Sequence, residues 1–160
     1  MGRSQVAAPG DLEGASEAEI DALEQHYGLL LPSTYRQYLS VMGHRSGRLF
    51  TSDHMAVFYS YVWDMTQDLR NGTDPALPSQ FQLPKDALIV AGRLGAAWEF
   101  IRCGQGVRLD DSEVWYFDER DWTIRRSHPS VFAWLEAWCG FAEEAIADGY
   151  FERNPKGTTP

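Results

Sequence analysis

SEAEIDALEQHYGLLLPSTYRQYLSVMG, residues 16–43, is the stretch that most strongly constrains the fold of this chain. Ser16 with Glu19 three residues later forms a capping box, which marks the start of a helix. Apolar residues then recur at steps of three and four, with charged residues on the other side. Gly28 suits the left-handed position after that helix, and Pro32 suits the first turn of the next one. The stretch therefore predicts a hairpin of two amphipathic helices that needs a surface to pack on.

The segment after this helical hairpin predicts one more helix before a set of strands. Apolar residues over 55–69 step by three and four, and Ser52 or Asp53 is available to cap the helix. Residues 49–50, in the connection before this helix, fit a short strand. Prolines over 71–84 break regular structure, so we expect a loop there.

Four short apolar runs bounded by turn residues predict strands, at residues 87–91, 97–102, 114–117 and 122–126. In the third run, Val114 and Tyr116 share one face of the strand. Trp115 and Phe117 share the other face, so burial of one pair would leave the other pair pointing outward or beneath another element. A Ser-His-Pro-Ser cluster at 127–130 predicts the start of a closing helix.

These elements together predict an α+β fold in a single domain. A central antiparallel β-meander packs with the N-terminal helical hairpin, a middle helix and a C-terminal helix, with the helices on one face of the sheet. We expect the domain to span residues 15–151, with a flexible leader at 1–14 and a tail at 152–160. Neither a signal peptide nor a membrane span is recognisable, so we expect a cytoplasmic protein with no membrane partner.

The charge distribution is the compositional feature with functional content. The net charge is −9, which disfavours direct binding to nucleic acid. Residues 110–121 hold six acidic residues and one arginine, a local charge of −5. A basic partner would explain this concentration, although a solvated turn is the general expectation for a charge cluster.

Several segments of the chain resemble the SUKH superfamily (Smi/Knr-type), which is dominated by bacterial immunity proteins. They are the helical hairpin with its Gly-x-x-Leu-Pro corner, LPKDALIV at 83–90, DDSEVWYFDE at 110–119 and SVFAWLEAW at 130–138. The resemblance implies an immunity protein that binds and neutralises a cognate bacterial toxin, either polymorphic, contact-dependent or secreted. Many such toxins act on nucleic acids through basic clefts, which an acidic inhibitor would be attracted to and fill. The alternative is a non-catalytic scaffold or regulatory module that uses the same fold to bind another protein.

We expect the partner, a basic protein toxin, to bind an acidic and aromatic surface. Carboxylates would supply charge, and tryptophans would supply anchors because they bury much area at little rotamer cost. The candidate partner-binding residues are Trp98, Asp110, Asp111, Glu113, Trp115, Asp118, Glu119, Asp121 and Trp122. Of these, Trp98 is the weaker candidate, since it could equally line a cleft or fill the core.

The sequence predicts no catalytic residues, metal ligands or cofactor. The histidines are scattered, the two cysteines lie far apart, and the glycine runs GRLG and CGQG match no phosphate-binding motif. The acidic cluster lacks the spacing of a calcium-binding loop, and any acidic hairpin offers carboxylate pairs. We therefore expect no enzyme activity. A cleft with two strongly perturbed carboxylates, or with a histidine–carboxylate pair, would favour an enzyme.

Overall fold

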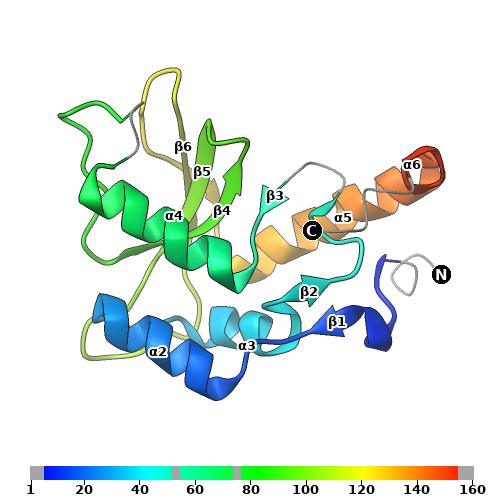
Figure 1. Cartoon of the computed structure of the whole chain (residues 1–160), viewed down its shortest axis with the longest axis horizontal. Coiled ribbons are helices and arrows are strands. Elements are labelled where there is room, and N and C mark those ends of the chain that lie inside the picture. The colour runs from blue at the N-terminus through cyan, green and yellow to red at the C-terminus, as the bar shows by residue number, and fades with distance from the viewer. Residues whose placement is uncertain (1–5, 52–54, 74–76, 155–160) are drawn as a thin grey trace.

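The structure is a computed structural model that describes residues 6–51, 55–73 and 77–154. Its elements in chain order are η1 (Pro9–Asp11), β1 (Leu12–Glu13), α2 (Glu17–Tyr27), α3 (Ser33–Met42), β2 (Arg45–Ser46), β3 (Met55–Ala56), α4 (Tyr59–Asn71), β4 (Ala87–Arg93), β5 (Ala97–Arg102), β6 (Val114–Asp118), β7 (Arg125–His128), α5 (Val131–Ala147) and α6 (Tyr150–Arg153). Within the described residues, β1 pairs with β2, and the other strands form one antiparallel sheet in the order β3-β4-β5-β6-β7. Figure 1 labels β1, β2 and, of the large sheet, β3 to β6. The predicted α+β meander is confirmed.

The helical hairpin forms as the sequence predicts. The hydroxyl of Ser16 accepts a hydrogen bond from Glu19 N, and the Glu19 carboxylate accepts one from Ser16 N at 2.8 Å. Gly28 ends α2 with φ 64°, a left-handed conformation that glycine adopts without strain. The apolar faces of α2 and α3 are buried, with Ile20 and Tyr35 both fully covered. The hairpin therefore packs on the core through the faces that the periodicity indicates.

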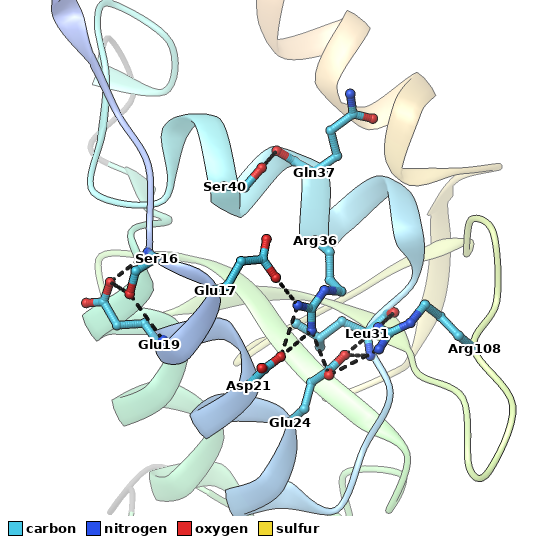
Figure 2. Close-up of polar contacts among 10 residues, drawn as sticks. All are labelled: Ser16, Glu17, Glu19, Asp21, Glu24, Leu31, Arg36, Gln37, Ser40 and Arg108. Carbon is cyan, nitrogen blue, oxygen red and sulfur yellow. Dashed lines mark hydrogen bonds and ion pairs between the residues drawn. The ribbon is translucent and has the colours of Figure 1, made fainter.

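A buried ionic corner joins the two helices to the β5–β6 loop (Figure 2). Glu24 of α2 accepts hydrogen bonds from Arg36 Nη1 at 2.8 Å and from Arg108 Nη1 at 2.5 Å. It also accepts one from Leu31 N at 2.7 Å. Burial alone would raise the pKa of Glu24, but the bonds from Arg108 and Leu31 N–H, with the charge of Arg36, lower it. The corner fixes the loop against α2.

The edge of β4 is covered by a helix over most of its length. β3 pairs only with the end of β4, at Arg93 and Gly92. Farther along β4, Ile89 N donates to Thr66 Oγ1 of α4 at 3.0 Å. Arg70 of α4 donates to the carbonyl of Ala87 at 2.9 Å. Because an open strand edge invites pairing with other chains, α4 protects this sheet.

Both faces of the sheet are buried, which differs from the expected single helical layer. The face that packs with α2, α3 and α5 contributes Leu88, Ile101 and Val114. The opposite face contributes Ile89, Phe100 and Phe117, covered by Leu69 of α4 and by residues 77–83. Val114 and Phe117 of β6 are therefore buried on opposite faces, so β6 has no wholly exposed face. The proline-rich loop forms the second cover, and it lacks a periodicity that would reveal this from sequence.

Three predictions differ from the structure by more than a residue or two at an element's end. The middle helix begins at Tyr59, and Met55–Ala56 form β3 instead of its first turn. The proposed caps, Ser52 and Asp53, lie outside the described residues. Residues 49–50 form a turn, and the nearby strand is Arg45–Ser46. The last strand is Arg125–His128 rather than 122–126, because Trp122 has φ 54° and interrupts the extended chain.

The described ends of the chain pack against the domain. In the segment 1–14, predicted as a leader, residues 6–14 include η1 and β1, and Val6 is buried. At the other end, Phe151 of α6 is buried beneath the guanidinium of Arg48, which lies 4.9 Å from the ring centroid. Among the described helices, none has the length and hydropathy needed to cross a membrane.

Candidate functional site

Two turns meet at one end of the large sheet. The β4–β5 turn and the β6–β7 turn share this end because the strands run antiparallel in sequence order. A hydrogen bond of 2.9 Å from Glu119 N to Ala96 O joins them. We call residues 93–97 and 118–124 the hairpin end. The β5–β6 loop lies at the opposite end of the sheet, beside α2 (Figure 1).

The predicted acidic residues are divided between these two ends. Asp118 is the last residue of β6, and Glu119 and Asp121 follow it, so all three lie at the hairpin end. Asp110, Asp111 and Glu113 precede β6 and lie at the other end. At about 3.3 Å per residue, the five residues of β6 separate the groups by roughly 15 Å. The acidic run in the sequence is therefore two separate groups in space.

Arginines pair with half of the predicted acidic residues. The pairs are Asp118 with Arg120 at 2.5 Å, Asp121 with Arg125, and Glu113 with Arg126 at 2.8 Å. The hydrogen bond from Arg125 lowers the pKa of Asp121 to about 2, so this carboxylate stays ionised. Six carboxylates against three arginines leave a net charge of −3. This net charge of −3 is smaller in magnitude than the −5 counted over residues 110–121 of the sequence.

The other three acidic residues differ in role. Asp111 accepts a hydrogen bond from Val131 N at 3.0 Å and so satisfies the start of α5. In the described part of the chain, the side chains of Asp110 and Glu119 have no hydrogen-bond or ionic partner, and both residues are exposed. Glu119 is thus the acidic side chain at the hairpin end that is available to a partner.

The predicted tryptophans belong to one aromatic cluster. Trp98 is buried and stacks on Trp122, with centroids 5.5 Å apart, and on Phe117 at 5.4 Å. Phe81 from the proline-rich loop lies 5.2 Å from Trp122. Trp115 is half-buried against the same cluster. The structure therefore brings the three tryptophans together, but as a second core with only partial exposure.

Part of this cluster faces solvent through a pocket of about 310 Å³. Trp122 and Asp121 line it together with Phe81 and Ile124. An aromatic wall beside a carboxylate suits a partner side chain that is both apolar and cationic. The sequence identified the first two residues but not Phe81, whose loop brings it there only in three dimensions.

A smaller cavity lies on the opposite face of the hairpin end. Its volume is about 150 Å³, and Glu99, Tyr116 and Trp138 contribute to its lining. Glu99 is buried and accepts a hydrogen bond from Trp134 Nε1 at 2.7 Å and one from Ser127 Oγ at 3.2 Å. Burial raises the pKa of Glu99. Sequence reasoning missed this residue, although a carboxylate inside the apolar run AWEFIR was a usable signal.

Glu99 also lies beside a histidine, the arrangement that would favour an enzyme. His128 Nδ1 is 3.9 Å from Glu99 Oε1, beyond hydrogen-bond distance. Burial lowers the pKa of His128 and raises the pKa of Glu99, so each group is shifted toward its neutral form. The Glu99 oxygens instead hold Trp134 and Ser127, and His128 does not line the cavity. The arrangement is that of a structural link between the sheet and α5.

The described residues do not favour a metal site or a nucleophilic cysteine. Over residues 6–51, 55–73 and 77–154, no group of three His, Cys, Asp or Glu side chains is placed to hold a metal ion. His54, one of the four scattered histidines, lies outside these residues. Cys103 is buried, and burial raises its thiol pKa to about 12, so it is a poor nucleophile.

Comparison with known proteins gives a match at the family level. Residues 14–137 match the SMI1 / KNR4 family (SUKH-1). The match covers the helical hairpin, the whole meander and the first part of α5. No curated protein matches the chain.

Proposed function

Because the chain belongs to the SMI1 / KNR4 family (SUKH-1), we propose that it is an immunity protein that binds and neutralises a cognate bacterial toxin. It acts by binding rather than by catalysis, as expected for a SUKH immunity protein. The toxin attacks nucleic acid in the cytoplasm, and the immunity protein meets it there. The observation that carries this proposal is the hairpin end, where an unpaired carboxylate, a partly exposed tryptophan and an exposed leucine lie together.

The hairpin end combines charge with apolar contact. Glu119 supplies a free negative charge, and Asp121 keeps its charge at neutral pH beside Arg125. Trp122 presents part of its ring in the pocket described above. Leu94 at the tip of the β4–β5 turn is 76% exposed. Apolar anchors surrounded by charged groups are typical of interfaces with a strong central contact.

Charge attraction fits a basic toxin. The chain carries −9 overall, which favours the approach of a positively charged partner and disfavours nucleic acid itself. Exposed charges act mainly on the association rate and are screened by salt. We therefore expect the complex to form more slowly as ionic strength rises.

The division of the acidic residues makes this proposal specific. The toxin uses Glu119, Asp121, Trp122 and Leu94, while Asp110 and Asp111 at the far end of the sheet stay outside the contact. Asp111 already satisfies the start of α5, so its role is structural. Asp110 is exposed and unpaired like Glu119, and the two make a matched pair for mutation.

The test starts with a pull-down from the native host at low and high salt, with mass spectrometry of the retained proteins. We expect a basic polypeptide with a toxic domain, whose toxicity co-expression of this chain suppresses. Glu119→Lys should then slow association by about tenfold and flatten its salt dependence. Asp110→Lys should leave both within about twofold.

Two results would overturn the proposal. Retention of regulatory or housekeeping proteins alone would favour a scaffold that uses the same fold. Equal effects of Glu119→Lys and Asp110→Lys on toxin binding would remove the hairpin end as the contact surface.

A further inference from the structure

The cavity lined by Glu99 has the size and chemistry of a site for one side chain. Its volume is about 150 Å³, and cavities of about this volume accommodate a benzene-sized group. Met55, Tyr116 and Trp138 contribute apolar and aromatic surface to it. Glu99, a residue that is 9% exposed, contributes its carboxyl group. The cavity therefore offers one buried charge within aromatic walls.

The hydrogen bonds to the Glu99 carboxyl do not fully replace the solvation that it loses on burial. Its two hydrogen bonds come from the neutral groups Trp134 Nε1–H and Ser127 Oγ–H. A carboxylate can accept about four hydrogen bonds, so acceptor capacity remains. Among the described residues, no lysine or arginine forms an ion pair with it, and burial keeps His128 toward its neutral form by lowering its pKa. A buried carboxylate without a cation gains much from one that arrives.

We propose that this cavity receives one cationic side chain, a lysine or an arginine, from the protein partner, with Glu99 as its counter-charge. The identity of that partner as a toxin rests on the proposed function; the cavity's preference for a cation does not. Tyr116 and Trp138 stabilise the same ligand, since aromatic faces attract cations.

Arg93 also lines the cavity and carries the same charge as this ligand. It is exposed at the end of β4, so water and salt screen its repulsion. Glu99 is buried, and its attraction is screened far less. The attraction of Glu99 for a cation therefore prevails over the repulsion from Arg93.

The test is a titration of the full chain with N-acetyl-arginine methylamide, followed through the indole N–H resonance of Trp138. N-acetyl-citrulline methylamide is the matched control, because it has the same shape without the charge. We expect a saturable shift at millimolar arginine probe and at least about tenfold weaker binding of the citrulline probe.

Glu99→Gln supplies the decisive variant, because glutamine keeps the shape and can still accept from Trp134. In it, the arginine probe should bind no better than the citrulline probe. Should this variant fail to fold, the carboxyl ¹³C resonance of Glu99 in the wild type gives the same information. The arginine probe should then lower the pKa of Glu99, and the citrulline probe should leave it unchanged.

Equal affinity for both probes, or no saturation with either, overturns the cation site. Neither result depends on a toxin, so the proposed function stands or falls separately. If a toxin is found and Glu99→Gln binds it as tightly as the wild type does, the cavity lies outside the toxin interface.

Discussion

The indole Nε1 of Trp134 lies 2.7 Å from Oε2 of Glu99 and donates a hydrogen bond to it, which joins α5 to β5. Both residues are buried, so this bond links two core elements through a polar pair. Burial raises the pKa of Glu99, so the folded protein holds its protonated form more readily than the unfolded chain does. Stability from this group is fully present below the ordinary carboxyl pKa of 4.5 and is lost as the pH rises through the folded value.

Replacing Glu99 with glutamine should therefore stabilise the folded protein most at neutral pH. Glu99→Gln is always neutral, so it avoids the cost of holding a buried charge above the pKa of Glu99. We expect its free energy of unfolding, relative to wild type, to rise by on the order of 1 kcal/mol between acidic and neutral pH. Urea denaturation across that range measures this. Glu144→Gln, on the exposed side of α5, should show no such gain, and a flat difference for Glu99→Gln would contradict the expectation.

Glu24 should show the opposite pH dependence. Its pKa is lowered in the folded state, so its stabilisation is present above 4.5 and is lost as the pH falls through the folded value. Glu24→Gln should cost about 1–3 kcal/mol at neutral pH, because Arg36 and Arg108 lose a shared counter-charge. The difference in unfolding free energy between Glu24→Gln and the wild type should become smaller at acidic pH. Glu17→Gln touches the same Arg36 but from an exposed position, and should cost under about 1 kcal/mol.

The sequence predicted the helical hairpin well because its signals are local. The capping box at Ser16, the glycine at 28 and the periodic apolar faces depend on neighbours within a few residues. The strands 87–91 and 97–102 were found for the same reason, as short apolar runs between turn residues. The start of α4 was misplaced because Met55 fits a helical period but pairs with Arg93, a partner distant in sequence.

The candidate surface was harder to predict because charge was counted along the chain. The sequence placed Asp110 and Asp121 in one acidic run, whereas β6 separates them and Arg125 neutralises the second. Trp98 was open to a core or a surface role, and its burial follows from contact with Phe117 and the distant proline-rich loop. Ion pairs and aromatic contacts between residues distant in sequence can be identified only once the register of the strands is known.

The helix that covers β4 gives a prediction about the sheet edge. Thr66→Val keeps the side-chain shape but removes the oxygen that accepts from Ile89 N, leaving a buried amide without a partner. We expect a loss of about 1–3 kcal/mol in unfolding free energy and faster hydrogen exchange at the Ile89 amide. Thr123→Val, at an exposed turn position, should change stability by less than about 0.5 kcal/mol. Unchanged protection of Ile89 would mean that α4 does not hold this edge.

A substitution at Leu94 should affect stability and partner binding in opposite directions. It has φ 52° and is followed by Gly95 with φ 68°, the two positive values of a type I′ turn, where asparagine before glycine is preferred. A leucine there costs about 1 kcal/mol of backbone strain. Its side chain is largely exposed and recovers little of that cost by packing. We therefore attribute its presence to contact with a partner.

Leu94→Asn should accordingly raise the free energy of unfolding by about 0.5–1 kcal/mol while weakening protection against the toxin. Denaturant midpoints measure the first effect, and survival on co-expression with the toxin measures the second. Val107→Asn is the control, since Val107 is 74% exposed but lacks a positive φ. It should change neither quantity, because it removes an exposed apolar side chain without relieving strain and lies in the β5–β6 loop. A Leu94→Asn variant that is stabilised and still fully protective would show that the turn strain serves no toxin contact.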